Sequence, residues 1–349
     1  MIDLIQIIDE LASGNYTNID DIDYIIIEEN AEVDSYLFKK ADEIRRKIYG
    51  NKVYIRGLIE IGNYCKNNCY YCGIRAKNKN ISRYRMTKDE ILECCKKGYV
   101  MGFRTFVLQS GEDDFFTDDM ICDIVSSIKE KFPDCAVTLS IGEKSRESYL
   151  RYYNSGAERY LLRQESATEA HYNLLHPTGM TLKNRIRCLN DLKEIGYQVG
   201  AGMMVGTPNQ TIHCLVNDVK FMLELQPDMI GIGPFISHSQ TPFWSEGVGS
   251  LRHTLLMVAL CRIIFPNALI PSTTALTIID QNGCELGLKA GANVVMPNLT
   301  PEKYRVLYQL YNKKVCTEKQ SADCLDLLKE TVKSAGYEVV VDKGDRIGF

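Results

Sequence analysis

Eight short runs of β-branched and other apolar residues recur along the chain and alternate with amphipathic helical segments. This alternation is typical of a parallel sheet covered by helices, because each parallel strand needs a crossover before the next one. Eight strands separated by seven helical segments predict an α/β fold, a (β/α)8 TIM-type barrel. The predicted strands are 53–61, 105–109, 136–141, 159–163, 198–203, 229–233, 268–271 and 292–296.

Both ends of the chain lie outside this pattern. Residues 1–50 carry apolar side chains at helical spacing and predict two or three N-terminal helices packed on the barrel. Residues 301–349 predict a C-terminal extension with a helix over 321–334 and a short strand over 339–341. No linker divides the chain, so we expect one structural unit with the barrel over 51–300.

Composition excludes several classes of function. A net charge of -4 provides no basic field, so nucleic acid is not an expected partner. No apolar run approaches the roughly 20 residues of a membrane span, and the first residues lack a secretory leader pattern. Thirteen cysteines, many of them inside apolar segments, are typical of free thiols in a reducing compartment. We therefore expect a cytoplasmic protein.

Three cysteines directly after the first predicted strand form the most specific motif in the chain. Cys65, Cys69 and Cys72 have the spacing C-x3-C-x2-C. They lie where a barrel carries its active site, at the carboxyl ends of the strands. A structural zinc would need a fourth ligand, and an electron-transfer cluster would need a fourth cysteine. No fourth Cys or His follows nearby in the sequence. Three thiolates would leave one iron of a four-iron cluster open to another ligand.

Polar and small residues also follow the other predicted strands. These strand ends are Ser110-Gly111-Glu112, Gly142-Glu143, Gln164-Glu165, Met203 to Gly206, Pro234-Phe235 with His238, Ser272-Thr273-Thr274, and Pro297-Asn298. Because all carboxyl ends of a barrel meet at one rim, we expect these groups to converge with the cysteines.

The cysteine motif, with aromatic Tyr71 before its last cysteine, resembles that of the radical S-adenosylmethionine (SAM) enzymes. Further segments resemble the HydE family of that superfamily, whose members help to build the organometallic cofactor of FeFe-hydrogenase. The similarity extends from about residue 30 to residue 325. The segments that carry it are 69–75, 78–80, 83–86, 107–113, 160–165, 200–206, 231–235 and 296–298.

The resemblance implies a role for each group. Cys65, Cys69 and Cys72 would hold one 4Fe-4S cluster, and SAM on its open iron would be cleaved to a 5′-deoxyadenosyl radical. The implied SAM-binding residues are Tyr71, Ser110, Gly111, Glu112, Arg163, Glu165, Arg185 and Met204, although Arg163 could instead be a structural partner of acidic residues. The implied substrate cavity, suited to small anionic groups, consists of Met203, Phe235, Ser272, Thr273, Thr274 and Tyr304. We interpret His238 as a structural residue.

Several alternatives stay open. A methylornithine synthase-like mutase acting on an amino acid is the second enzyme hypothesis, and a biotin synthase is less favoured because its strand cysteines are not reproduced. A non-enzymatic hypothesis is an iron-sulfur carrier or scaffold. The expected partners are a small-molecule or small iron-complex substrate, an electron donor such as ferredoxin or flavodoxin, and other hydrogenase maturases.

A second cluster is not predicted. Some HydE proteins carry three further cysteines at spacing C-x7-C-x2-C, and this chain has Cys316 and Cys324 but Leu327 at the third position. Two thiols cannot hold a conventional 4Fe-4S cluster.

Overall fold

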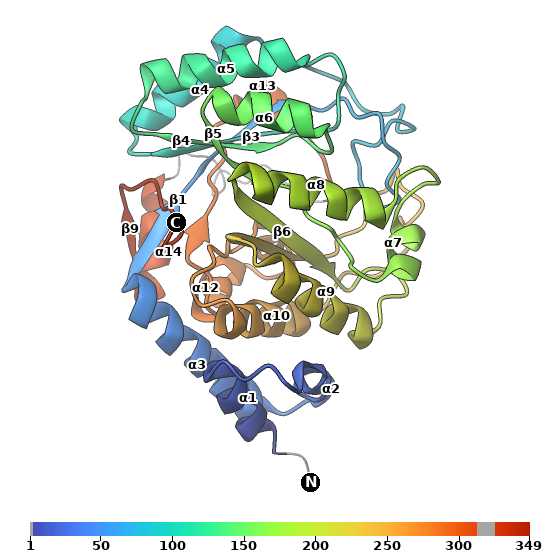
Figure 1. The fold of residues 1–349 in the computed structure, drawn as a ribbon, viewed down its shortest axis with the longest axis vertical. Helices are drawn as coiled ribbons and strands as arrows, with labels where there is room; N and C mark the ends of the chain where they lie inside the picture. The colour runs from blue at the N-terminus through green and yellow to red at the C-terminus, as the bar shows by residue number, and fades with distance from the viewer. Residues whose placement is uncertain (1–2, 313–324) are drawn as a thin grey trace.

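The computed structural model describes residues 3–312 and 325–349. Its centre is a six-stranded parallel sheet in the order β2-β3-β4-β5-β6-β7 (Figure 1). These strands are β2 (Gly57–Gly62), β3 (Thr105–Ser110), β4 (Ala136–Ser140), β5 (Ala157–Leu161), β6 (Gln198–Val205) and β7 (Met229–Pro234). A second parallel sheet, in the order β8-β1-β9, contains β1 (Lys52–Ile55), β8 (Val294–Val295) and β9 (Glu338–Val340).

Isolated parallel bridges connect the two sheets. Met229 of β7 pairs with Leu269, Pro271 pairs with Val294 of β8, and Leu58 of β2 pairs with Asn298. Parallel pairing therefore continues from β7 past β8 and back to β2. This arrangement fits the predicted α/β barrel class.

Two predicted strands differ from the observed ones. The run 53–61 divides at Arg56, because its first half pairs with β8 and β9 while its second half pairs with β3. The run 268–271 forms only isolated bridges. Buried side chains form hydrogen bonds with its backbone in place of strand pairing: Arg262 donates to the carbonyl of Ala268, and Asn293 accepts from the amide of Ile270.

Helices surround the strands and begin and end at local signals. Thr87 and Glu90 form a capping box at the start of α4, and Gly196, with a φ of 107°, ends α8. The surrounding helices are α4 (Lys88–Val100), α5 (Asp118–Lys131), α6 (Arg146–Asn154), α7 (Glu169–Leu175), α8 (Leu182–Ile195), α9 (Ile212–Leu225), α10 (Leu251–Ile264), α11 (Thr274–Ile279) and α12 (Gly283–Lys289).

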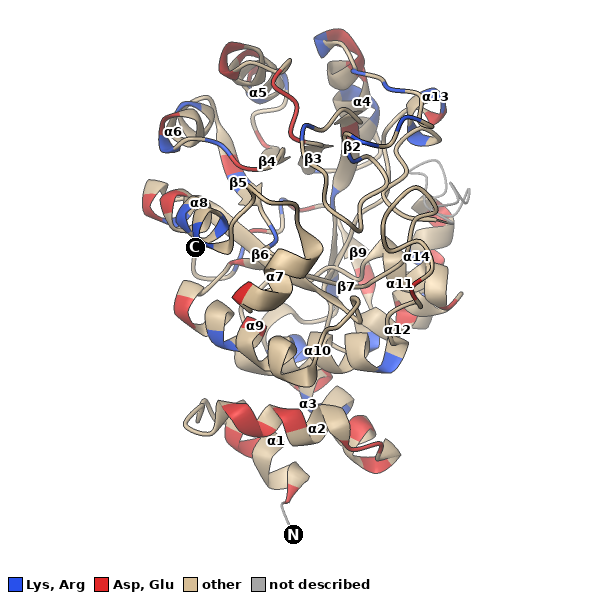
Figure 2. Cartoon of the chain, turned by 90° about the vertical axis from the view of Figure 1, so that its right-hand side faces the viewer, with Lys and Arg blue, Asp and Glu red and all other residues tan. Residues whose placement is uncertain are grey.

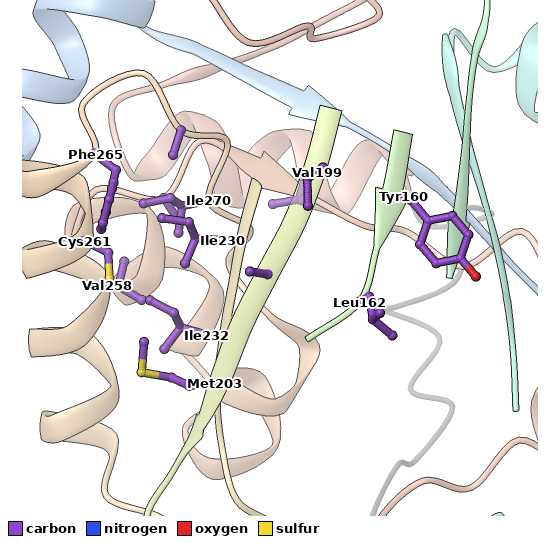
Figure 3. Packing of buried hydrophobic residues seen from close by; sticks show 14 of the residues in the cluster. Tyr160, Leu162, Val199, Met203, Ile230, Ile232, Val258, Cys261, Phe265 and Ile270 are labelled. Carbon is purple, nitrogen blue, oxygen red and sulfur yellow. The ribbon is translucent and has the colours of Figure 1, made fainter. Parts of the chain in front are cut away.

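The N-terminal residues form helices, as predicted. They are α1 (Leu4–Ala12), α2 (Ile22–Ile27) and α3 (Ala31–Tyr49), with a short 3-10 turn at Ile19–Asp21. The apolar side of α3 is buried, and its Asp34 forms an ion pair of 2.6 Å with Arg252 of α10. Figure 3 shows the next layer of this core, where Ile230 and Ile232 of β7 lie beside Val258 and Cys261 of α10.

The last residues of the C-terminal extension cover the amino ends of the strands, the end opposite the predicted site. After α13 (Glu302–Arg305), the described chain resumes with α14 (Leu325–Ser334) and β9. In the last residues Asp345 pairs with Arg159 of β5 at 2.6 Å, and the carbonyl of Lys343 accepts from Thr105 at the start of β3. The predicted helix over 321–334 is thus seen from Leu325 onward.

Cys316 and Cys324 lie outside the described residues, so the absence of a second cluster stays a prediction. The division of the chain into 1–50, 51–300 and 301–349 also stays a prediction. Across residues 3–312 and 325–349, no helix is both long and apolar enough to span a membrane.

Candidate active site

The three cysteines lie on the loop after β2, and all three line one cavity of about 400 Å³. The loop has no regular structure, so its carbonyl groups need other partners. Arg83 supplies them: its guanidinium donates to the carbonyls of Ile74 at 2.8 Å, Arg75 at 2.7 Å and Asn78 at 3.0 Å, and also to that of Asn63. One half-buried cation therefore holds both sides of the cysteine loop in place.

The end of β3 touches the cysteine loop because Gly111 has no side chain. A Cβ atom at Gly111 would lie 2.4 Å from the carbonyl oxygen of Tyr64 and 2.5 Å from Cβ of Cys65. The amide of Lys66 donates to the carbonyl of Glu112 at 2.8 Å across the same contact. The Ser110-Gly111-Glu112 segment therefore lies directly beside the first cysteine.

The arrangement of the thiols fits a multi-iron cluster. In the described part of the chain, no three His, Cys, Asp or Glu side chains converge as ligands of a single metal ion. The three thiols instead share the wall of one cavity, where burial and, to a smaller extent, the neighbouring Cys65 raise the pKa of Cys72 to about 12. A positively charged group in the cavity would favour the thiolate forms that bind metal. The residues present therefore fit the predicted group.

Glu165 occupies a strained position in the loop that follows β5. Its φ of 65° lies in the left-handed region, which non-glycine residues rarely adopt. Neighbouring contacts hold it there: its amide donates to the carbonyl of Gly202 at 3.0 Å, and Gln164 accepts from the amide of Gly202 at 2.8 Å. Arg163 donates through Nε to Glu165 at 3.1 Å, and both side chains line the cavity. The structural partnership considered for Arg163 is thus present, and strain of this kind is typical of functional sites.

Arg185 joins the ends of two strands to α8. Its Nε lies 2.6 Å from Oε1 of Glu143, which follows β4, and the amide of Glu143 donates to Glu112 at 3.0 Å. Asn184 donates to the other carboxylate oxygen of Glu143 at 2.6 Å. Glu143 was among the strand-end residues that we expected to meet at the rim, but the residues implied to bind SAM did not include it.

Tyr71 lines the cavity with its hydroxyl directed at a buried histidine. Its Oη lies 3.1 Å from Nε2 of His176, and Nδ1 of His176 lies 2.9 Å from the carbonyl oxygen of Tyr172. A carbonyl can only accept, so we assign the proton to Nδ1 and conclude that Nε2 accepts from Tyr71. Burial lowers the pKa of His176 to about 3, so the ring is neutral. The tyrosine ring is thereby fixed at one end.

The cavity brings together most of the residues predicted for the site. In addition to the residues described above, Ser110, Met204, Phe235, Ser272, Thr273 and Thr274 line it. Met203 and Tyr304 do not. The side chain of Met203 points to the opposite face of β6 from that of Met204 and is buried in the core (Figure 3). Tyr304 instead stacks on Tyr84 at 4.6 Å and donates to Glu90 at 2.8 Å, so we leave both residues out of the site.

The cavity also contains residues that the sequence did not single out. Glu60, Gln109, Met180, Tyr308 and Tyr311 contribute to its wall. The sulfur of Met180 lies 3.8 Å from that of Cys69. Gln109 lies within the family-like segment 107–113 but was given no role, and the others come from strand interiors and loops that only the tertiary structure brings together.

The family model of the radical SAM superfamily matches residues 59–222, from within β2 through the cysteine loop and β6 into α9. A barrel-type α/β fold with three loop cysteines at the cavity defines the same class of enzyme. The protein is a radical SAM enzyme, and members of this superfamily use a 4Fe-4S cluster and SAM as cofactors.

More specific relatives define the family. The chain is 48% identical over 310 residues to the [FeFe] hydrogenase maturase subunit HydE of Thermotoga maritima, covering 89% of this chain and 88% of that protein. It therefore belongs to the HydE family, and the resemblance described from the sequence is confirmed.

Two further comparisons are more distant. The chain is 30% identical over 295 residues to the 3-methylornithine synthase of Methanosarcina acetivorans, covering 84% of this chain and 83% of that protein. The crystal structure of a methylornithine synthase (PylB) superposes with a TM-score of 0.85 at 26% identity, covering 97% of each chain.

Proposed function

We propose that this enzyme is a HydE-type maturase that cleaves SAM reductively in assembling the organometallic cofactor of FeFe-hydrogenase. The observation that carries the proposal is the 48% identity to a HydE maturase subunit over 89% of the chain, together with the cysteine-lined cavity. The substrate would be a small molecule or a small iron complex, because the cavity of about 400 Å³ is formed within a single barrel.

The cysteine loop would hold the cluster through Cys65, Cys69 and Cys72. When bound, the cluster and SAM supply the reductive cleavage of a sulfonium to methionine and a 5′-deoxyadenosyl radical. The protein contributes position: Arg83 holds the loop, and Gly111 lets the end of β3 approach it closely.

The charged groups of the cavity would bind and orient SAM. Glu165 can accept from both ribose hydroxyls, and the guanidinium of Arg185, which Glu143 orients, can pair with the methionine carboxylate. Glu112 can accept from the ammonium group, and the ring of Tyr71 offers a surface for adenine. The other proposed SAM-binding residues are Ser110, Gly111, Arg163 and Met204.

The remaining wall would receive the substrate. The residues proposed to line this part are Phe235, Ser272, Thr273 and Thr274, which follow β7 and the bridge-forming residues 269–271. Within the described residues, Oγ1 of Thr273 is buried and has no hydrogen-bond partner. Buried hydroxyls without a partner are costly, so this group is suited to hydrogen-bond a ligand.

The second candidate is a methylornithine synthase-like mutase acting on an amino acid. It is favoured by the superposition on methylornithine synthase over 97% of both chains. The lower sequence identity, 30% against 48%, places it second.

The free thiols and the proposed reaction support a cytoplasmic setting. All eleven cysteines in the described residues are free, which is typical of the reducing cytoplasm. We place the enzyme there with a ferredoxin or flavodoxin as reductant and with other hydrogenase maturases as partners.

The test uses anaerobically reconstituted enzyme with SAM and dithionite. We expect formation of 5′-deoxyadenosine, its loss in Cys72→Ala, and its retention in Cys122→Ala, a matched thiol on α5 outside the cavity. The enzyme should also restore hydrogenase activity to a cell that lacks its own HydE. Consumption of lysine without such restoration would instead identify the mutase.

A further inference from the structure

The loop that carries the cysteines has a charge unlike that of the rest of the chain. Between Glu60 and Asp89 the sequence contains seven lysines and arginines and no acidic residue, whereas the whole chain has a net charge of -4. Figure 2 shows blue segments in the loops beside β2, α4 and α13. A concentrated basic segment in an acidic protein produces a local positive field at the rim of the cavity.

Five of these cations have internal partners, including Lys88, which pairs with Asp123 at 2.7 Å, and buried Arg75, which lies over the ring of Tyr70; within the described residues, two exposed lysines have none. Arg83 binds loop carbonyls, Arg85 pairs with Asp113 at 2.6 Å, and Lys66 pairs with Asp114 at 3.0 Å. Lys77 and Lys79 are exposed, and within residues 3–312 and 325–349 neither side chain forms an ion pair. Their charges are therefore available to a molecule outside the chain.

These lysines are held close to the cysteines. The amide of Lys77 donates to the side chain of Asn68 at 2.8 Å, and Asn68 directly precedes Cys69. The amide of Ala76 donates to the carbonyl of Asn67 at 2.8 Å, which fastens the same two segments together. Lys77 thus lies on the outer side of the loop whose inner side carries the thiols.

An exposed aromatic residue extends this surface. The loop after β7 contacts the cysteine loop, because Gln240 accepts from Asn80 at 2.6 Å and the ring of Phe243 lies 6.1 Å from that of Tyr70. The next residue, Trp244, is 64% exposed. Tryptophan is enriched in protein interfaces, where a large ring supplies much of the contact area.

We propose that Lys77, Lys79 and Trp244 form the docking surface for a small acidic electron-donor protein, an inference that rests on the proposed function. The donor loses one electron and the site behind the loop gains it. Negative charge on the donor complements the lysines and speeds encounter, while Trp244 supplies apolar contact. A small surface of this kind suits redox partners, whose complexes are transient and bury little area.

The test compares two reductants on reconstituted holoenzyme. The double variant Lys77→Glu/Lys79→Glu is compared with the control Lys47→Glu/Lys131→Glu. The control makes the same charge change at exposed positions in the last turns of α3 and α5. Binding of a purified, negatively charged bacterial ferredoxin is measured by calorimetry at several ionic strengths. Formation of 5′-deoxyadenosine is measured with that ferredoxin in its reduced form and, separately, with dithionite.

For Lys77→Glu/Lys79→Glu we expect a Kd for ferredoxin about tenfold or more higher at low salt, a weaker salt dependence, and a dithionite-driven rate within twofold of wild type. Trp244→Ala should raise Kd severalfold without changing the salt dependence, and the control pair should bind like wild type. An unchanged Kd in the lysine variant, or an equal loss in the control pair, overturns the docking surface. Wild-type enzyme that forms no 5′-deoxyadenosine with dithionite overturns the proposed function instead, while the binding measurement still tests the surface.

Discussion

Asp218 provides a sharp test of how the loop that presents Glu165 is held. Its side chain on α9 is fully buried, and Oδ1 accepts from Nε2 of Gln164 at 3.1 Å and from the amide of Ala167 at 2.7 Å. Oδ2 is buried and has no hydrogen-bond partner among the described residues. Burial raises the pKa of Asp218 from 3.8 to about 7 in spite of the two hydrogen bonds.

The sign of the effect on stability follows from this raised pKa. The folded protein keeps a proton that the unfolded chain has already lost, so Asp218 lowers the free energy of unfolding as pH rises from about 4 to 7. The full difference between the pKa values of 3.8 and about 7 corresponds to about 4 kcal/mol, of which about 1.7 kcal/mol has developed at pH 5. Asparagine keeps an acceptor for both donors and carries no charge.

Asp218→Asn should therefore stabilise the protein more at high pH than at low pH. For 349 residues the unfolding entropy is about 0.7 kcal/mol per kelvin, which converts these energies to a Tm gain of about 6 °C at pH 8 and about 2 °C at pH 5. Anaerobic scanning calorimetry at both pH values measures the two gains. Asp326→Asn, an exposed carboxylate on α14, is the control and should give the same small change at each pH. Equal gains for Asp218→Asn at both pH values, or a loss at pH 8, would refute the reasoning.

Three further predictions concern the site and its support. Gly111→Ala should lower the iron content after reconstitution, because a Cβ would lie 2.4 Å from the carbonyl oxygen of Tyr64. The control Gly247→Ala, at a position with nothing within 4 Å, should leave the iron content unchanged, and equal iron contents in the two variants would contradict the prediction. His176→Phe should raise the Kd for SAM about tenfold, because it leaves the Tyr71 hydroxyl without its acceptor. Adding Tyr71→Phe should recover part of the lost affinity, and a double variant that binds SAM no better than His176→Phe would count against the assigned hydrogen bond. Asp345→Asn should lower the free energy of unfolding by about 1–3 kcal/mol in denaturant titration, because fully buried Arg159 loses its 2.6 Å ion pair, and an unchanged midpoint would contradict that role.

Much of the active site could be predicted because its signals are local. The spacing of Cys65, Cys69 and Cys72 is a property of one loop, and the rule that barrel sites lie at strand ends placed Ser110 to Glu112, Glu165 and Thr273 on one rim. All of these line the cavity. The error at Met203 has an equally local cause, since neighbouring residues of a strand point to opposite faces and the sequence does not show which one faces the cavity.

The sequence by itself determined the class of the fold and the cysteine loop, because hydrophobic period and ligand spacing are set by backbone geometry over a few residues. Only the tertiary structure decided which charged groups meet: Arg163 with Glu165, Arg185 with Glu143, and Asp345 with Arg159. It also decided that the run 53–61 divides between two sheets and that the C-terminal residues cover the amino ends of the strands. These choices depend on contacts between residues far apart in the chain, where many pairings satisfy the same local pattern and the packing of the whole barrel selects one.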